Sequence, residues 1–141
     1  MFIVIDGIDG SGKGAQVKLI EEILKKQWKT VKILDYPRYG NGAAFAVEKY
    51  LNGEYGENLS AKQSSVLYAL DRFDDSFDFR KDLEKYDFVI SNRYVSASMI
   101  HQGWKIQDKN ERDEFLKWLD DFEFNIMGIP RPDKVLFLNV T

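Results

Sequence analysis

The sequence predicts an α/β fold, in which helices cover both faces of a mostly parallel sheet. Three observations favour this class. Short apolar runs alternate along the chain with longer segments whose apolar residues recur at helical spacing. The first apolar run leads into a glycine-rich turn that ends in a lysine. The length of 141 residues suits one domain with a modest core, so we expect residues 1–141 to form a single domain.

The chain opens on the pattern of a strand, a glycine loop and a helix. Residues 2–5 are apolar without interruption, which is typical of a strand buried on both faces. Gly7, Gly10 and Gly12 then allow a tight turn whose backbone amides face inward, and Lys13 follows it. Amide dipoles and a fixed positive charge at a helix N-terminus predict a binding site for a polyphosphate. An ordinary strand-to-helix turn is the alternative interpretation.

One position departs from the usual phosphate-loop motif. The motif has Ser or Thr directly after the lysine, where its hydroxyl ligates magnesium. This chain has Gly14 and then Ala15, and neither residue carries a hydroxyl. Mg²⁺ takes most of its oxygen ligands from substrate phosphates and water. We therefore expect the metal site to be weakened and not lost.

Capping and turn residues place the later elements. Pro37 ends the second strand, because a proline disfavours helix at the residue before it. Ser60 and Gln63 have the spacing of a capping box, so a long helix should begin at about Ala61. The other predicted elements are strands over residues 31–35, 87–91 and 134–140, and helices over residues 12–28, 43–51, 96–101 and about 110–124.

Two helices carry apolar stripes that we expect to face the core. The stripe of the long helix consists of Val66, Leu67, Leu70, Phe73 and Phe77, and that of the last helix consists of Phe115, Trp118, Leu119 and Phe122. We interpret the acidic cluster in the long helix, Asp74, Asp75 and Asp78, as a solvated face. A metal site at this cluster is the alternative.

The composition excludes several kinds of partner. With a net charge of −3, the chain lacks the excess positive charge that binding to nucleic acid or a membrane surface requires. No apolar run approaches the roughly 18 residues that a membrane-spanning helix needs. Cysteine is absent, which removes disulfides and thiolate metal sites and is typical of a reducing compartment. We expect a cytoplasmic protein with neither nucleic-acid nor membrane partners.

Polar residues follow the carboxyl ends of three predicted strands, where ligands bind in parallel sheets. In chain order they are Asp9 and Lys13, then Arg38, then Asn92, Arg93 and Tyr94, and the long helix adds Tyr68 and Arg72 on one face. Close positive charges repel by about 4 kcal/mol per pair at an effective dielectric constant of about 20. Such a cluster requires carboxylates or a bound anion, and a phosphate monoester beside a polyphosphate meets that requirement.

Five segments, spread over the whole chain, carry a resemblance to a known family. They read GIDGSGK at 7–13, YPR at 36–38, LYALDR at 67–72, NRY at 92–94 and GIPRPDKVLFL at 128–138. In this order they resemble thymidylate kinases, P-loop enzymes that transfer the γ-phosphoryl of ATP to deoxythymidine monophosphate. The resemblance implies a P-loop nucleoside-monophosphate kinase-like domain. Its fold is a three-layer α/β/α sandwich with four strands present here, ATP and the monophosphate are its substrates, and Mg²⁺ enters with ATP.

The resemblance also implies roles for individual residues. The ATP phosphates are assigned to Gly7, Asp9, Gly10, Ser11, Gly12, Lys13, Gly14 and Ala15. For the acceptor, Asp9 holds the 3′-hydroxyl, Arg38 and Arg93 hold the phosphate, Tyr68 stacks on thymine, Arg72 bonds a base carbonyl, and Gln102 is a base-side contact. The catalytic set is Lys13, Arg93, Asp9 and Asn92, and no residue ligates the metal directly, although Asp6 or Asp9 reaches it through water.

Several features leave alternatives open. The family usually has aspartate at Asn92, and an amide is neither a base nor a counter-charge for magnesium, so we expect slower turnover. His101 is either packed at a helix end or close to the 2′-position of the sugar, and Tyr68 is alternatively a core residue.

Family members continue past Thr141 with an arginine-bearing lid and a further strand, so we expect those parts to be missing here and the strand near Leu136 to form an open edge. A homodimer is typical of the family. Two alternative functions remain. The chain is a catalytically silent nucleotide-binding module, or it is a kinase for another nucleoside monophosphate.

Overall fold

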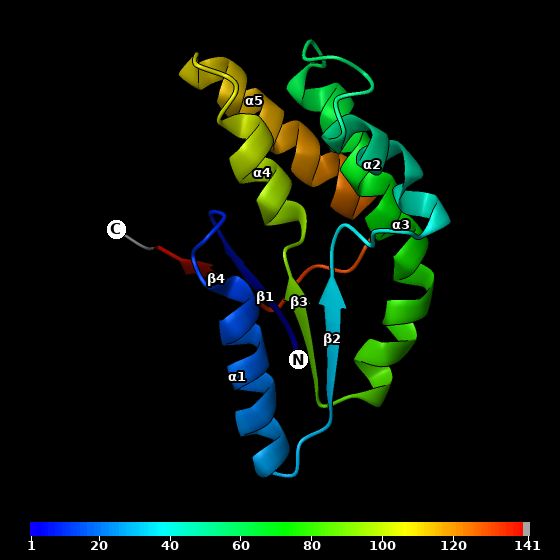
Figure 1. Ribbon diagram of the computed structural model, residues 1–141, viewed down its shortest axis with the longest axis vertical. Helices are drawn as coiled ribbons and strands as arrows, with labels where there is room; N and C mark the ends of the chain where they lie inside the picture. Colours follow the sequence, from blue (N-terminus) through cyan, green and yellow to red (C-terminus); the bar gives the residue numbers. More distant parts are fainter. Residues whose placement is uncertain (140–141) are drawn as a thin grey trace.

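Parallel strands form the sheet at the centre of the computed structural model, which describes residues 1–139 (Figure 1). Within these residues the strand order is β2-β3-β1-β4. The strands are β1 (Phe2–Gly7), β2 (Val31–Asp35), β3 (Phe88–Asn92) and β4 (Lys134–Leu138). All three strand pairings are parallel, so the carboxyl ends of the strands meet at one edge of the sheet. The predicted strand over 134–140 ends at Leu138 in the described residues, and Val140 lies outside them.

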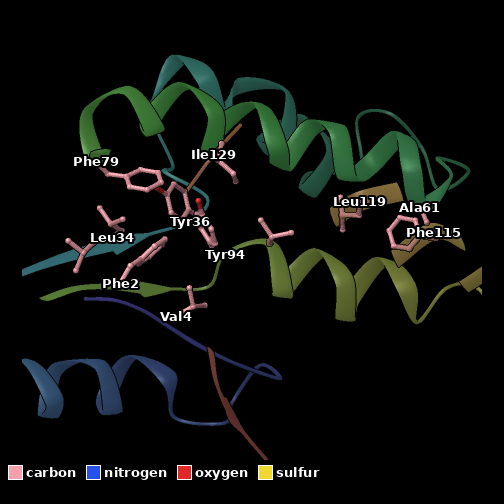
Figure 2. Close-up of a cluster of buried hydrophobic side chains, with 12 residues drawn as sticks. Phe2, Val4, Leu34, Tyr36, Ala61, Phe79, Tyr94, Phe115, Leu119 and Ile129 are labelled. Atoms are coloured by element: carbon pink, nitrogen blue, oxygen red, sulfur yellow. The ribbon is translucent and has the colours of Figure 1, made fainter. Parts of the chain in front are cut away.

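Helices cover both faces of this sheet, as the sequence predicts. In Figure 2, α1 lies on one side of the strands and α3 on the other. The helices are α1 (Lys13–Lys26), α2 (Phe45–Leu51), α3 (Ala61–Lys85), α4 (Val95–Gly103) and α5 (Lys109–Asp120), with a 3₁₀ turn η1 (Gly42–Ala44) and a π-helical turn η2 (Asp121–Ile126). The N-terminal half of α3 stands with α2, α4 and α5 beyond the carboxyl ends of the strands (Figure 1). The three-layer α/β/α prediction is confirmed.

Within the described part of the chain, no helix combines the length and apolar character that crossing a membrane requires.

Two separate cores hold the layers together. The core under α3 is rich in aromatic residues, and Tyr94 lies at its centre with ring centroids 5.1 Å from Phe2 and 6.1 Å from Phe79 (Figure 2). Both pairs are edge-to-face, which is the favoured geometry for aromatic rings. The smaller core under α1 consists of Ile5, Val17, Val31 and Ile90, with Ile20 and Leu24 packed against them. The sheet is therefore apolar on both faces, as parallel sheets require.

The long helix α3 begins where the capping box predicts. The face that it buries differs from the one that the apolar spacing predicts. Ser60 Oγ accepts a hydrogen bond from the Gln63 amide at 3.1 Å, and Gln63 Oε1 accepts one from the Ser60 amide at 2.9 Å. The predicted apolar stripe is wrong at Leu70 and Phe77, which are 42% and 61% exposed, whereas Phe73 packs against the core as predicted. The buried residues are mostly small or polar, namely Ala61, Ser64, Ser65, Ala69, Asp71, Arg72, Ser76 and Phe79. This face can be buried because partners on other elements satisfy its polar groups.

The C-terminal elements match their predictions with two differences. Phe115 and Leu119 of α5 are buried as expected, whereas Trp118 and Phe122 are half-buried and stack on each other with centroids 5.1 Å apart. The helix predicted to reach residue 124 ends at Asp120 and continues as the π-helical turn η2. Val135, Leu136 and Phe137 of β4 are 44–49% exposed at the edge of the described sheet, as we expect of an open edge.

Candidate active site

The loop between β1 and α1 has the geometry that its glycines predict. Gly10 and Gly12 adopt left-handed backbone angles, with φ of 78° and 86°. A Cβ at Gly7 would lie 2.8 Å from Ser11 Oγ and 2.9 Å from a backbone oxygen of β4, so only glycine fits there. Lys13 is buried, and its Nζ donates to the carbonyl oxygens of Gly7 and Ile8 at 3.1 and 2.9 Å. Its ammonium is therefore held on the loop itself.

Asp6 supports this loop from beneath. It is fully buried, and its Oδ1 accepts a hydrogen bond from the Gly7 amide at 2.8 Å while its Oδ2 accepts one from the Ser96 hydroxyl at 2.7 Å. The carboxylate thus ties the end of β1 to the first turn of α4. Both oxygens are engaged, which makes Asp6 a residue that positions the loop.

A cavity of about 400 Å³, here called the loop cavity, opens in front of the glycine loop. It brings together the carboxyl ends of β1, β2 and β3. Its lining includes Asp9, Gly10, Gly12, Lys13, Gly14, Asp35, Tyr36, Pro37, Tyr39, Asn92 and Arg93. The predicted convergence of the strand-end loops is confirmed, because Lys13 and Arg93 line the same cavity.

A second, tighter cavity of about 40 Å³, here called the inner cavity, adjoins the first. Its walls come from α3, α4 and the loop after β2. They consist of Tyr36, Pro37, Tyr68, Arg72, Arg93, Ala97, Ser98, His101 and Gln102. Tyr36, Pro37 and Arg93 belong to both linings. Arg93 therefore stands at the junction of the two cavities.

Arg93 has an unusual backbone that suits this position. Its φ is 69°, in the left-handed region that residues other than glycine rarely adopt, and strain of this kind clusters at functional sites. Its amide donates to Ile5 O at 3.0 Å, which continues the β3–β1 pairing. Its guanidinium donates to the exposed carboxylate of Asp9. The pair joins the glycine loop to the end of β3.

The end of β2 lies beside the end of β3. Asp35 and Asn92 are direct Cα partners in the parallel pairing of these strands, and both line the loop cavity. Asn92 Oδ1 is buried and has no hydrogen-bond partner within the described residues. Although Asp35 reaches solvent, partial burial raises the pKa of its carboxyl, and the charge of Arg93 opposes this shift.

The inner cavity is built on a buried ion pair. Arg72 is 2% exposed, and its Nε and Nη2 donate to the two carboxylate oxygens of Glu123 at 2.7 and 2.8 Å. Nη2 also donates to Ser98 Oγ at 3.1 Å. Burial lowers the pKa of Arg72, but the charge and hydrogen bonds of Glu123 outweigh it and hold the pKa above its usual value. Arg72 is therefore a charged group in a fixed orientation.

Three further side chains give this cavity its polar lining. Gln102 Oε1 accepts a hydrogen bond from Ser64 Oγ at 2.7 Å, which orients the amide. Burial, followed by the neighbouring Tyr50, raises the pKa of Tyr68 to about 12, so its hydroxyl is neutral at physiological pH. His101 Nε2 is buried and has no partner in the part of the chain that the structure describes. His101 lines the inner cavity from the last turn of α4.

The comparisons with known proteins agree with this geometry. The family model for thymidylate kinase matches residues 5–141. The chain belongs to the thymidylate kinase family. The thymidylate kinase of Mycobacterium tuberculosis H37Rv is 31% identical over 143 residues, which cover 100% of this chain and 66% of that protein. The thymidylate kinase of Plasmodium falciparum is 28% identical over 99% of this chain and 61% of its own length. The chain thus spans less than two thirds of the length of these relatives.

Solved thymidylate kinases share the fold. The structure from Candida albicans superposes with a TM-score of 0.77 at 23% identity, covering 99% of this chain and 63% of that one. The structure from Ehrlichia chaffeensis superposes with a TM-score of 0.71 at 24% identity, covering 99% of this chain and 71% of that one.

The thymidylate kinase resemblance implies that Arg38 binds the acceptor phosphate. In the structure its side chain points to α3 instead. Its guanidinium donates to Asp71, Asp74 and Asp75 on α3 at 2.8, 2.9 and 3.4 Å, and it is absent from the lining of both cavities. Burial lowers the pKa of Arg38, but the bonds to Asp74 and Asp71 raise it further. The predicted solvated face is wrong for Asp75, whose side chain is 16% exposed, and correct for Asp74, which is exposed although it pairs with Arg38. Asp78 is exposed as expected.

Sequence reasoning missed the partners that orient the predicted residues. Glu123 fixes Arg72, and Asp71 accepts from both the amide and the guanidinium of Arg38. A signal for Glu123 exists, because it lies four residues after Leu119 on the inward face of the last helix. Asp71 carries no comparable signal. Within residues 1–139, no group of three or more His, Cys, Asp or Glu side chains could hold a metal ion.

We predict that Glu123→Ala lowers the free energy of unfolding by about 3–5 kcal/mol, because it leaves the Arg72 guanidinium buried without a counter-charge. Urea unfolding followed by circular dichroism measures the change. Asp120→Ala is the matched control, since it removes an exposed partner of Arg131 on the same segment and should change stability little. Equal effects of the two substitutions would contradict the role of the buried pair.

Proposed function

We propose that this protein, acting as one P-loop domain, transfers the γ-phosphoryl group of ATP to deoxythymidine monophosphate and produces ADP and dTDP. The observation that carries the proposal is the junction of the two cavities at Arg93. One cavity is lined by a phosphate-binding loop, and the other is a small polar cavity with a fixed arginine. The relatives are named thymidylate kinases, which supports the same reaction.

The ATP phosphates bind over the glycine loop in this proposal. The loop amides at the start of α1 and the buried Lys13 favour a polyphosphate in front of them. Lys13 exchanges the carbonyl oxygens of Gly7 and Ile8 for phosphate oxygens of the nucleotide. The Mg²⁺ that accompanies ATP neutralises charge on those oxygens.

Thymine occupies the inner cavity. Tyr68 offers a ring for stacking, which is worth about 1–3 kcal/mol per base. Arg72 donates to a base carbonyl, and Gln102 contributes its amide NH₂, because its carbonyl oxygen already accepts from Ser64. Donors of this kind match the carbonyl groups of thymine and oppose the amino group of cytosine.

The acceptor phosphate lies between the two cavities. Asp9 and Arg93 exchange their mutual ion pair for the 3′-hydroxyl and the phosphate of the acceptor. Arg38 is a second phosphate contact only after it leaves one of its three aspartates.

The reaction is a direct in-line displacement. An acceptor phosphate oxygen attacks the γ-phosphorus, the bond to the bridging oxygen of ADP breaks, and the electron pair leaves with ADP. Lys13 and Arg93 stabilise the charge on the transferring group. Asn92 lines the loop cavity as an amide and accepts no proton, so catalysis depends on positioning and on these positive charges.

We also propose that the protein is a cytoplasmic homodimer. The apolar face of α3, formed by the exposed Leu70 and Phe77 with the half-buried Val66 and Leu67, is the surface that a second copy covers. The lack of cysteine fits a reducing compartment.

A coupled assay of ADP release tests the reaction across several acceptors. We expect the highest kcat/KM with deoxythymidine monophosphate, and a value at least about tenfold lower with deoxycytidine monophosphate, whose amino group leaves cavity donors unpaired. Equal rates with every acceptor would contradict the base assignment. Binding of both nucleotides without ADP release would instead show a silent binding module.

The substitution Lys13→Ala should weaken ATP binding at least about tenfold, because it removes charge-assisted hydrogen bonds to phosphate. Thymidylate binding should stay unchanged. Isothermal titration calorimetry measures both affinities, and Lys18→Ala, at an exposed position of the same helix, is the control. Unchanged ATP affinity in the Lys13 variant would refute the loop assignment.

Sedimentation equilibrium tests the dimer. We expect twice the mass of 16.4 kDa for the unmodified chain and a monomer for Leu70→Asp, which places a charge in the apolar face of α3. Trp28→Asp alters an exposed aromatic residue elsewhere and should leave the mass unchanged. A dimer that survives Leu70→Asp would show that another face pairs.

A further inference from the structure

Three carboxylates lie at or beneath the loop cavity, and their surroundings differ. Asp6 is fully buried with both oxygens engaged by Gly7 and Ser96. Asp9 is paired with Arg93. Asp35 lines the cavity and feels the charge of Arg93, but no lysine, arginine or histidine of the described residues lies within ion-pair distance of it. Asp35 is therefore the carboxylate that remains available to a ligand in this cavity.

The neighbour of Asp35 is a second oxygen donor without a partner. Asn92 is its direct Cα partner on β3, and adjacent strands lie about 4.8 Å apart. Asn92 Oδ1 is buried and makes no hydrogen bond within the described residues. Leaving a buried acceptor unpaired is destabilising, so this oxygen is suited to a ligand. The two strand ends thus place a carboxylate and an amide oxygen side by side in one cavity.

The charge of the cavity decides which ligand suits this pair. Lys13 and the loop amides bind phosphate, and a carboxylate facing the same phosphates repels them. A cation between the carboxylate and the phosphates turns this repulsion into attraction. Carboxylate and amide oxygens are hard donors of the kind that Mg²⁺ and Mn²⁺ accept. The donor set therefore fits a divalent cation carried by the nucleotide.

We propose that Asp35 and Asn92 together hold the divalent cation of the bound nucleotide, with Asp35 supplying the negative charge. This proposal rests on the proposed function, because the cation enters with ATP. The proposed site compensates for two differences from the family's motifs. Gly14 and Ala15 offer no hydroxyl to the metal, and residue 92 is an amide where the resemblance implies an aspartate. The carboxylate is present one strand away, at the end of β2.

The experiment uses Mn²⁺ as the probe, and electron paramagnetic resonance counts free Mn²⁺ in the presence of protein and β,γ-methylene-ATP. We expect Asp35→Asn to weaken Mn²⁺ binding at least about tenfold, because it removes the negative charge that faces the cation. Asn92→Asp should tighten it. The double variant Asp35→Asn/Asn92→Asp should recover affinity near that of the unmodified chain. Asp113→Asn, the same charge change at an exposed position of α5, should have no effect.

The outcomes separate this proposal from the proposed function. Unchanged Mn²⁺ affinity in Asp35→Asn, while the nucleotide analogue still binds, would overturn the metal assignment and leave the kinase assignment standing. Failure of the double variant to recover affinity would overturn the placement of both residues in one site. If the unmodified chain does not bind the analogue at all, the proposed function fails first. Calorimetry of the analogue without metal supplies that measurement.

Discussion

The parallel register of β1, β2 and β3 is the constraint on which the site depends. Ile5, Asn92 and Asp35 lie side by side across the three strands, so the residues that follow them leave the sheet at one level. A slip of one residue in either pairing would turn the strand-end side chains to the opposite face. The two cores prevent that slip, because the strands are apolar toward both helix layers. Packing far from the cavities thus sets their geometry.

Local signals explain how much of the fold could be predicted. The glycine loop, the capping box at Ser60 and the apolar runs each act over a few residues. The loop and the capping box appear where the sequence predicts them, and the strand predicted over residues 87–91 is shifted by one residue. The inward face of α3 could not be predicted in this way. Arg72 is buried because Glu123, 51 positions away, balances its charge, and such pairing leaves no trace in apolar spacing.

The candidate site likewise combines features that could be predicted from the sequence with features that depend on distant residues. Lys13 and Arg93 meet because the topology of a parallel sheet requires it, and topology follows from the order of strands and helices. Arg38 does not line either cavity, because its guanidinium pairs with three carboxylates on α3. A motif gives a residue's place in the chain, whereas the direction of a long side chain depends on every charge within its reach.

The small size of the inner cavity has a kinetic consequence. A volume of about 40 Å³ holds a few water molecules and is far below the roughly 300–1,000 Å³ of a ligand pocket. The walls on α3 and α4 must therefore separate before any aromatic ring can enter between them. Entry of a ligand then requires this opening in addition to diffusion to the surface. Arg72 on α3 donates to Ser98 Oγ on α4 at 3.1 Å, so this hydrogen bond must break when the two walls separate.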